Sequence, residues 1–174
     1  LPSLCGARTD LPAHSYAIPP VAPDAADDVR TICRMVAEAD AVLATGHLSA
    51  AEARWLLETA HGLGVRRMLL THPGYTVPDM APEEAAELAA LGAYAEITTF
   101  QLLHQPGVTG AWLAAYAERV GLDRVVLSSD AGQPDSPPPP EALHLLIDAL
   151  ARQGLDRGAL LACAGELPEA LVTP

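Results

Sequence analysis

The chain has 174 residues and a formal net charge of −12, from 22 acidic and 10 basic side chains. This excess of negative charge repels phosphate backbones and anionic membranes, so we expect neither a nucleic-acid nor a membrane partner. A chain of this length buries roughly 70% of its unfolded surface, and residues 1–174 are predicted to form a single domain. All ten basic residues are arginine, which excludes Schiff-base lysine chemistry and a carbamylated-lysine metal bridge.

Cysteine usage and the N-terminal composition bear on the compartment. Cys5, Cys33 and Cys163 are widely spaced and form no C-x-x-C pair. This spacing argues against a disulfide framework and against a cysteine-ligated zinc. The first residues contain no basic segment and no long apolar stretch, so neither a signal peptide nor a membrane span is predicted. We therefore expect a cytoplasmic protein.

From residue 24 onward, helical patterns alternate with short apolar runs, which indicates βα units around a parallel sheet. The predicted helices cover 24–38, 49–64, 82–92, 111–120 and 141–153, with a last short helix starting near 156. The predicted strands cover 41–45, 68–71, 93–98 and 125–128. A longer connection is expected at 99–109, and the proline run at 137–140 is expected to be a rigid loop.

Two local signals mark the helix that starts at Ser49. Glu52 stands three residues after this serine, which is the spacing of a capping box that satisfies early backbone donors reciprocally. Gly64 is expected to end the same helix, because glycine readily adopts the conformation that stops a helix.

Several architectures fit such a pattern. The spacing of 25 residues from His47 to His72 and of 24 from His72 to Glu96 is compatible with a leucine-rich solenoid. The regular Leu and Asn ladders of such repeats are absent, and the chain contains no Asn at all. An open doubly wound sheet and a closed eight-stranded barrel both fit the near-continuous apolar strands. The positions of the polar residues distinguish these two architectures.

Potential metal ligands stand at or near the ends of four successive predicted strands: His47, His72, Glu96 and Asp130. Parallel strands all end on one side of a sheet, so these side chains are expected to converge there, as on the active face of a barrel. Two neutral imidazoles and a carboxylate suit Zn²⁺, with Mn²⁺ or Fe²⁺ as alternatives, and a metal-bound water can reach a pKa of about 7. Asp130 is also expected to be catalytic, because a carboxylate can handle the proton of that water.

Each of these residues also has a structural interpretation. A single histidine after a strand often only forms hydrogen bonds, but His47 and His72 occupy the same phase of consecutive units, which favours ligation. Asp130 could cap the segment after Ser129 instead. Glu96 lies inside its strand, where an unpaired charge facing the core would be costly, so it is expected to face the barrel mouth as a ligand or substrate contact.

Other polar residues are weaker candidates. His61 and His144 fall within predicted helices and are expected at the surface or between helices. His104 lies in the longer connection and could reach the site. His14 belongs to a proline-rich stretch. Ser128 has no G-x-S-x-G elbow around it, so a serine nucleophile is not expected.

Three segments resemble proteins of the amidohydrolase superfamily, which are metal-dependent hydrolases with a distorted (β/α)8 TIM barrel. The resembling segments are 44–49, 70–73 and 127–133. In that superfamily, histidines end the fifth and sixth strands and an aspartate ends the eighth. The resemblance therefore implies that His47, His72 and Asp130 are metal ligands, and that Glu96 belongs to the seventh strand.

The same resemblance implies that about strands five to eight are present. These enzymes carry a His-x-His pair on the first strand, and no such pair occurs in the 174 residues. A C-terminal half barrel would leave two open strand edges and an apolar face. We expect a truncated chain, or one that pairs with a missing N-terminal half or forms a homo-oligomer, and that is inactive or weakly metal-binding alone.

The predicted activity is metal-dependent hydrolysis of an amide, lactone or ester-like bond in a small-molecule substrate, with a phosphoester substrate also open. A metal-dependent lyase or decarboxylase on the same barrel is the first alternative. A non-catalytic half barrel with a binding or assembly role is the second.

Overall fold

The fold is built on a four-stranded sheet, seen here in a computed structural model that describes residues 16–173. Its strands are β1 (Val42–Ala44), β2 (Arg67–Leu70), β3 (Ala93–Thr98) and β4 (Val125–Ser128). All neighbouring pairs are parallel, and the order in the sheet is β1-β2-β3-β4. The predicted α/β class is therefore confirmed. The strand order does not reverse, as it would at the switch point of a doubly wound sheet.

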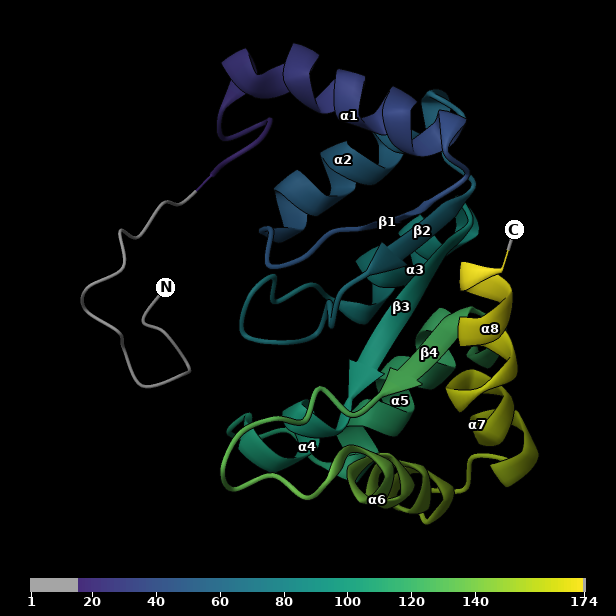
Figure 1. Ribbon diagram of the computed structural model, residues 1–174. Helices are drawn as coiled ribbons and strands as arrows, with labels where there is room; N and C mark the ends of the chain where they lie inside the picture. Colours follow the sequence, from purple (N-terminus) through teal and green to yellow (C-terminus); the bar gives the residue numbers. More distant parts are fainter. Residues whose placement is uncertain (1–15, 174) are drawn as a thin grey trace.

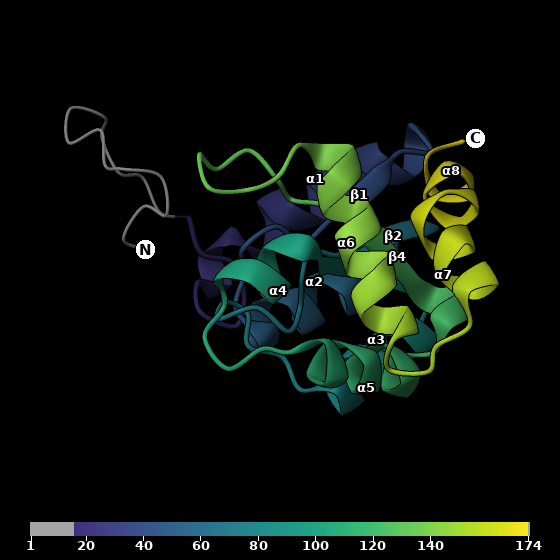
Figure 2. The same ribbon diagram turned by 90° about the horizontal axis from the view of Figure 1, so that it is seen from below.

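Helices connect and flank the strands. They are α1 (Ala26–Glu38), α2 (Ala50–Gly62), α3 (Pro82–Ala90), α4 (Thr99–His104), α5 (Gly110–Val120), α6 (Pro139–Ala151), α7 (Arg157–Ala164) and α8 (Glu166–Val172), with short 3-10 turns η1 (Pro23–Ala25) and η2 (Leu122–Arg124). Figure 1 shows α1 and α2 at the β1 end of the sheet and α7 and α8 at the β4 end. In Figure 2, α6 lies between α4 and α7, both of which it contacts. Among residues 16–173, no helix is long and apolar enough to cross a bilayer.

Local signals in the sequence account for several boundaries. The capping box predicted at Ser49 and Glu52 is present and opens α2. Gly64 has a φ of +86° and Gly121 a φ of +97°, conformations in which glycine avoids the steric cost of a Cβ atom. The strands predicted at 93–98 and 125–128 are confirmed to the residue.

Other expectations were wrong in detail. The connection expected at 99–109 begins with helix α4, because the Thr98 hydroxyl accepts a hydrogen bond from the Gln101 backbone and the Gln101 side chain closes a capping box. Helix α6 starts at Pro139, so half of the proline run is helical, as the first turn of a helix tolerates proline. Helix α8 was not predicted. The expectations for residues 1–4, for Cys5 and for His14 lie outside the described residues.

The sheet buries one face more completely than the other. In β3, the side chains of Ala93, Ala95 and Ile97 are at most 1% exposed, whereas the alternating Tyr94 and Glu96 are only partly buried. Successive strand residues point to opposite faces, so the helices cover the first face and leave the second partly open. Each edge strand, β1 and β4, pairs with a single neighbour among the described residues. Polar groups can therefore sit on the open face and at the strand ends without entering the core.

Candidate functional site

The segments that follow all four strands lie on the same side of the sheet, at the left in Figure 1. This arrangement places the residues that follow β1 and β2 side by side. As a result, the ring centroids of His47 and His72 lie 4.9 Å apart. The two histidines predicted to converge therefore do so.

The backbone turns sharply at this edge. Gly46, directly before His47, has a φ of +59°, His72 has +26° and Asp130 has +47°. Non-glycine residues with such angles cost about 1 to 3 kcal/mol each and gather at functional sites. Among residues 16–173 the non-glycine residues in this region number four: Asp40, His72, Asp79 and Asp130. Two of the four are predicted site residues.

Two threonines hold the histidine backbones in place. The hydroxyl of Thr71 accepts a hydrogen bond from the Gly46 backbone N–H at 3.1 Å, and the hydroxyl of Thr45 accepts one from the Thr71 N–H at 3.1 Å. These reciprocal bonds join the two strand ends directly beside the rings. Sequence reasoning missed both residues, although a threonine precedes each histidine by one or two positions and was available as a signal.

His72 is the most deeply buried of the candidate residues, with 5% of its surface exposed. Burial holds the pKa of His72 below its ordinary value; the neighbouring His47 acts in the same direction, and Glu96 and Asp130 act against it. Its Nδ1 atom is buried and has no hydrogen-bond partner. A transition metal or a polar group of a ligand would give this nitrogen of the neutral imidazole a partner.

Glu96 supports His72 from the next strand. One carboxylate oxygen accepts a hydrogen bond from the His72 backbone N–H at 3.3 Å, and the other accepts one from the Ser128 hydroxyl at 2.8 Å. The carboxylate thus bridges β4 and the end of β2 on the open face of the sheet. The Ser128 hydroxyl is thus a hydrogen-bond donor to Glu96.

Asp130 is exposed in the turn after β4. It is close enough to His72 to act on the pKa of that imidazole. In the part of the chain that the structure describes, however, no three His, Cys, Asp or Glu side chains are grouped closely enough to hold a metal ion. The complete ligand set predicted from the sequence is therefore not assembled in this conformation, although the two imidazoles meet.

An aromatic row continues from the histidine pair along the same edge. The ring of Tyr75 lies 5.2 Å from that of His72, Phe100 lies 5.6 Å from Tyr75, and His104 lies 4.7 Å from Phe100, all measured between centroids. The row joins the segment after β2 to helix α4 after β3. His104, predicted to be able to reach the site, stands at its far end and contacts His72 only through the two intervening rings.

The remaining predicted residues lie away from this edge. His61 in α2 and His144 in α6 are exposed, as expected. Cys33 and Cys163 are buried free thiols. Burial raises the pKa of Cys163 to about 11, so this side chain is a protonated core residue at neutral pH.

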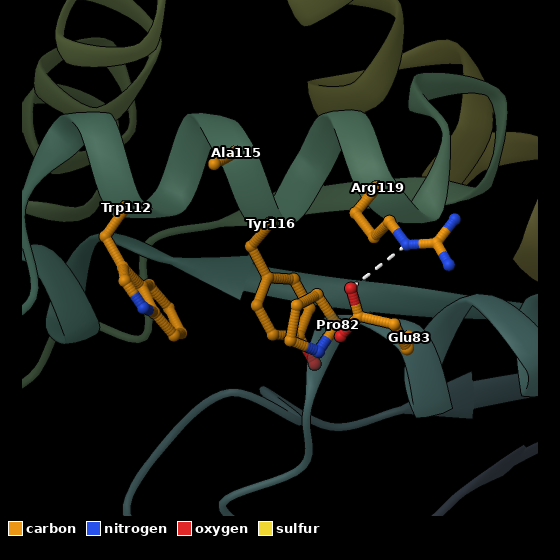
Figure 3. A pocket seen from close by; sticks show the side chains of 6 residues that line it. All are labelled: Pro82, Glu83, Trp112, Ala115, Tyr116 and Arg119. Carbon is orange, nitrogen blue, oxygen red and sulfur yellow. Dashed lines mark hydrogen bonds and ion pairs between the residues drawn. The ribbon is translucent and has the colours of Figure 1, made fainter.

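A groove of about 270 Å³ lies on the outer helical layer, between α3 and α5. Its lining consists of Pro82, Glu83, Trp112, Ala115, Tyr116 and Arg119. Trp112, Tyr116 and Arg119 project from one side of α5, and Arg119 pairs with Glu83 at 3.2 Å (Figure 3). None of the candidate site residues lines it, so the groove is separate from the histidine pair.

The fold and this site describe an α/β protein with a polar, histidine-containing edge on a parallel sheet. A family of unknown function (DUF6282) is similar to the chain over residues 14–96. The match covers slightly less than half of the chain. It includes β1, β2 and the part of β3 up to Glu96, with His47, His72 and Glu96 but not Asp130. No curated protein matches the chain.

Proposed function

We propose that this protein is a metal-dependent hydrolase that acts on an amide, lactone or ester-like bond of a small molecule. His47, His72 and Asp130 would hold a divalent cation, Zn²⁺ by preference, at the carboxyl edge of the sheet, and Asp130 would also be catalytic. Glu96 would contribute negative charge and a further ligand oxygen. We also propose a cytoplasmic location, because Cys33 and Cys163 are unpaired thiols.

The main support for this proposal is the Nδ1 atom of His72, which is buried and has no hydrogen-bond partner. The ring of His72 lies 4.9 Å from that of His47, measured between centroids. A buried polar atom without a partner costs about 1 to 3 kcal/mol. That cost would be removed when the deprotonated nitrogen binds a cation. The donor set of two imidazoles and carboxylates suits Zn²⁺. Since the described side chains do not yet form a three-ligand group, the ligand set would close only on cation binding.

The sequential parallel order of the strands supports a barrel as the parent architecture. We propose that β1 to β4 correspond to strands five to eight of a distorted (β/α)8 barrel, in which active sites lie at the carboxyl ends of the strands. The candidate residues occupy that edge here. The unpaired edges at β1 and β4 are where the remaining strands of such a barrel would pair.

The chain's own residues would have distinct tasks. When bound, the cation would act as a Lewis acid and would lower the pKa of water. Thr45 and Thr71 hold the two histidine backbones in register. Glu96 orients His72 through its backbone N–H. Asp130, which is exposed at the rim, would receive a proton from water and return it to a leaving group.

Metal content tests this function most directly. Purified protein is stripped with chelator and dialysed to equilibrium against a series of Zn²⁺ concentrations, and the metal bound at each concentration is measured by mass spectrometry. We expect about one Zn²⁺ per chain, with loss of most of it in His47→Ala and His72→Ala, because each removes one ligand. His61→Ala and His144→Ala remove exposed histidines from helices and serve as matched controls that retain the metal.

Unspecific surface binding would appear as equal loss in all four variants. A wild-type chain that retains no Zn²⁺, or His47→Ala and His72→Ala variants that retain it fully, would contradict the proposal. Hydrolysis is then assayed on the loaded protein with amide, lactone and ester substrates in ¹⁸O-labelled water, since only hydrolysis incorporates solvent oxygen into the product.

A further inference from the structure

The turn that carries Asp130 is fastened to helix α4 at two points. The backbone N–H of Phe100 donates to the carbonyl of Ser129 at 3.2 Å. At the other end of α4, the Nε2 atom of His104 lies 3.1 Å from the hydroxyl oxygen of Ser136. Segment 129–136 is therefore held along the length of α4.

The hydrogen bonds of this segment have a definite direction. The amide nitrogen of Gln133 donates to the backbone carbonyl of Asp130 at 3.2 Å, which leaves its amide oxygen to accept. The Ser136 hydroxyl donates to that oxygen at 2.8 Å. A hydroxyl has one proton, so Ser136 must accept at its oxygen from His104, whose Nε2 atom is then the protonated one. His104, Ser136 and Gln133 form a chain of donors that ends on Asp130.

The surroundings of His104 restrict its position further. Its ring packs against Phe100 with centroids 4.7 Å apart, and its other nitrogen, Nδ1, lies 3.7 Å from the carboxylate of Asp135. The imidazole is half-buried between these groups. It can therefore act as a fixed anchor for a turn in which no residue from 129 to 136 is fully buried.

The backbone at which this chain of donors ends has an unfavourable conformation. Asp130 has a φ of +47° and Gly132 a φ of +154°. A non-glycine residue in the left-handed region persists when surrounding contacts hold it there. The bond from Gln133 to the Asp130 carbonyl is one of those contacts.

From this connection we propose that His104 is a positioning residue for Asp130. Acting through Ser136 and Gln133, it holds the turn in the conformation from which the Asp130 carboxylate would complete the ligand set with the histidine pair when the cation binds. This role rests on the function proposed above, in which Asp130 is a ligand. His104 itself does not touch the bound cation or the substrate.

Amide hydrogen exchange on the full metal-free chain tests the anchor itself. We expect His104→Ala and Ser136→Ala to speed exchange in peptides covering 130–136 by about tenfold or more, because both break the same donor chain. His104→Gln retains an amide donor and is expected to restore slow exchange. His144→Ala is the matched control, and peptides covering 42–47 should be unchanged in every variant.

Binding of Co²⁺, followed by its visible absorption, tests the consequence for the site. We expect His104→Ala, Ser136→Ala and Gln133→Ala to weaken Co²⁺ binding by about 10- to 100-fold and to alter the absorption bands, as loss of outer partners of ligands does. His104→Gln should recover most of the affinity. The melting temperatures of these variants show whether the fold is retained, and the Ser136 and Gln133 variants remain informative if His104→Ala unfolds.

The outcomes separate the two proposals. A wild-type chain that binds no Co²⁺ overturns the proposed function and the role of His104 in it, while the exchange data still report on the anchor. A wild-type chain that binds Co²⁺, with variants that bind it within twofold of wild type, overturns only the role of His104. Unchanged hydrogen exchange in both His104→Ala and Ser136→Ala would also overturn only the role of His104.

Discussion

The His72 imidazole combines 5% exposure, a positive φ and an unpartnered Nδ1 atom in one residue. Each of these features is unfavourable for stability when no ligand is bound. Burial of a neutral histidine also couples folding to pH, because the unfolded chain takes up a proton that the folded chain resists. The residue therefore has a measurable signature in the metal-free protein.

Stability should decrease on acidification in part because of His72. Its folded pKa lies below its ordinary value, chiefly through burial. The unfolded state, with a pKa of about 6.5, therefore binds the proton first, so stability is retained above that pH and falls as the pH drops below it. We expect His72→Asn, which cannot titrate and tolerates positive φ, to lose less stability than wild type between pH 7.5 and 5.5.

Guanidinium unfolding in the presence of chelator at both pH values measures this difference. His144→Asn replaces an exposed histidine and should keep the wild-type pH dependence. An equal loss of stability in His72→Asn and wild type would show that His72 is not resistant to protonation in the fold.

A second residue-scale prediction concerns Gly74, in the segment after His72. A Cβ atom there would lie 2.7 Å from Cη2 of Trp112 and 2.9 Å from Cε2 of Tyr116. The Tyr116 ring is fixed, since it is buried and its hydroxyl donates to the Met80 carbonyl at 3.1 Å. We expect Gly74→Ala to lower the free energy of unfolding by about 1 to 3 kcal/mol through overpacking. Gly62→Ala has no atom within 4 Å of the new methyl group and should be neutral or slightly stabilising, which chemical denaturation will check.

At the scale of elements, the side chain of Glu52 both caps helix α2 and forms a contact with a distant segment of the chain. Glu52 completes the capping box with Ser49, and its other carboxylate oxygen accepts a hydrogen bond from the Ile18 backbone N–H at 3.0 Å. Although burial acts to raise it, these hydrogen bonds hold the pKa of Glu52 below its usual value. The side chain thus joins the start of α2 to the segment that precedes α1.

Removal of this carboxylate should weaken the fold more than removal of an exposed one in the same helix. We expect Glu52→Ala to cost about 1 to 3 kcal/mol, because the Ile18 and Ser49 N–H groups lose their acceptor. Glu58→Ala, whose side chain is 54% exposed and 3.6 Å from Arg54, should cost less than about 0.5 kcal/mol. Equal costs, measured by urea denaturation, would show that the Glu52 bonds are not significant in solution.

For the whole molecule, the sheet provides the shared core against which the helices pack. Leu70 in the inner strand β2 is fully buried, and its register partner Ala95 in β3 is buried as well. The helix-covered face of the sheet is therefore continuous across the strands. A defect in it should affect the entire domain.

We expect Leu70→Ala to destabilise the protein by about 2 to 5 kcal/mol, through lost burial and the cavity left behind. Fluorescence of Trp55 and Trp112, which lie on α2 and α5, should shift to the same new midpoint as circular dichroism. Leu161→Ala, at a position 52% exposed, should change stability by less than about 0.5 kcal/mol. Separate midpoints for the probes would indicate that the sheet does not couple the two ends of the molecule.

The sequence by itself determined the βα order, the opening of α2 at Ser49, the extent of β3 and β4, and the phase that brings His47 and His72 to one edge. These features depend on periodicity and on bonds between residues three or four positions apart, and both can be recognised in the amino-acid sequence. The tertiary structure alone decided the threonine bonds between strand ends, the row from His72 to His104, and the unpartnered Nδ1 atom. The threonine bonds, the bond from His72 to Glu96 and the contact of Tyr75 with Phe100 join residues 24 to 26 positions apart. No local spacing specifies which side chains meet when separate strands come together.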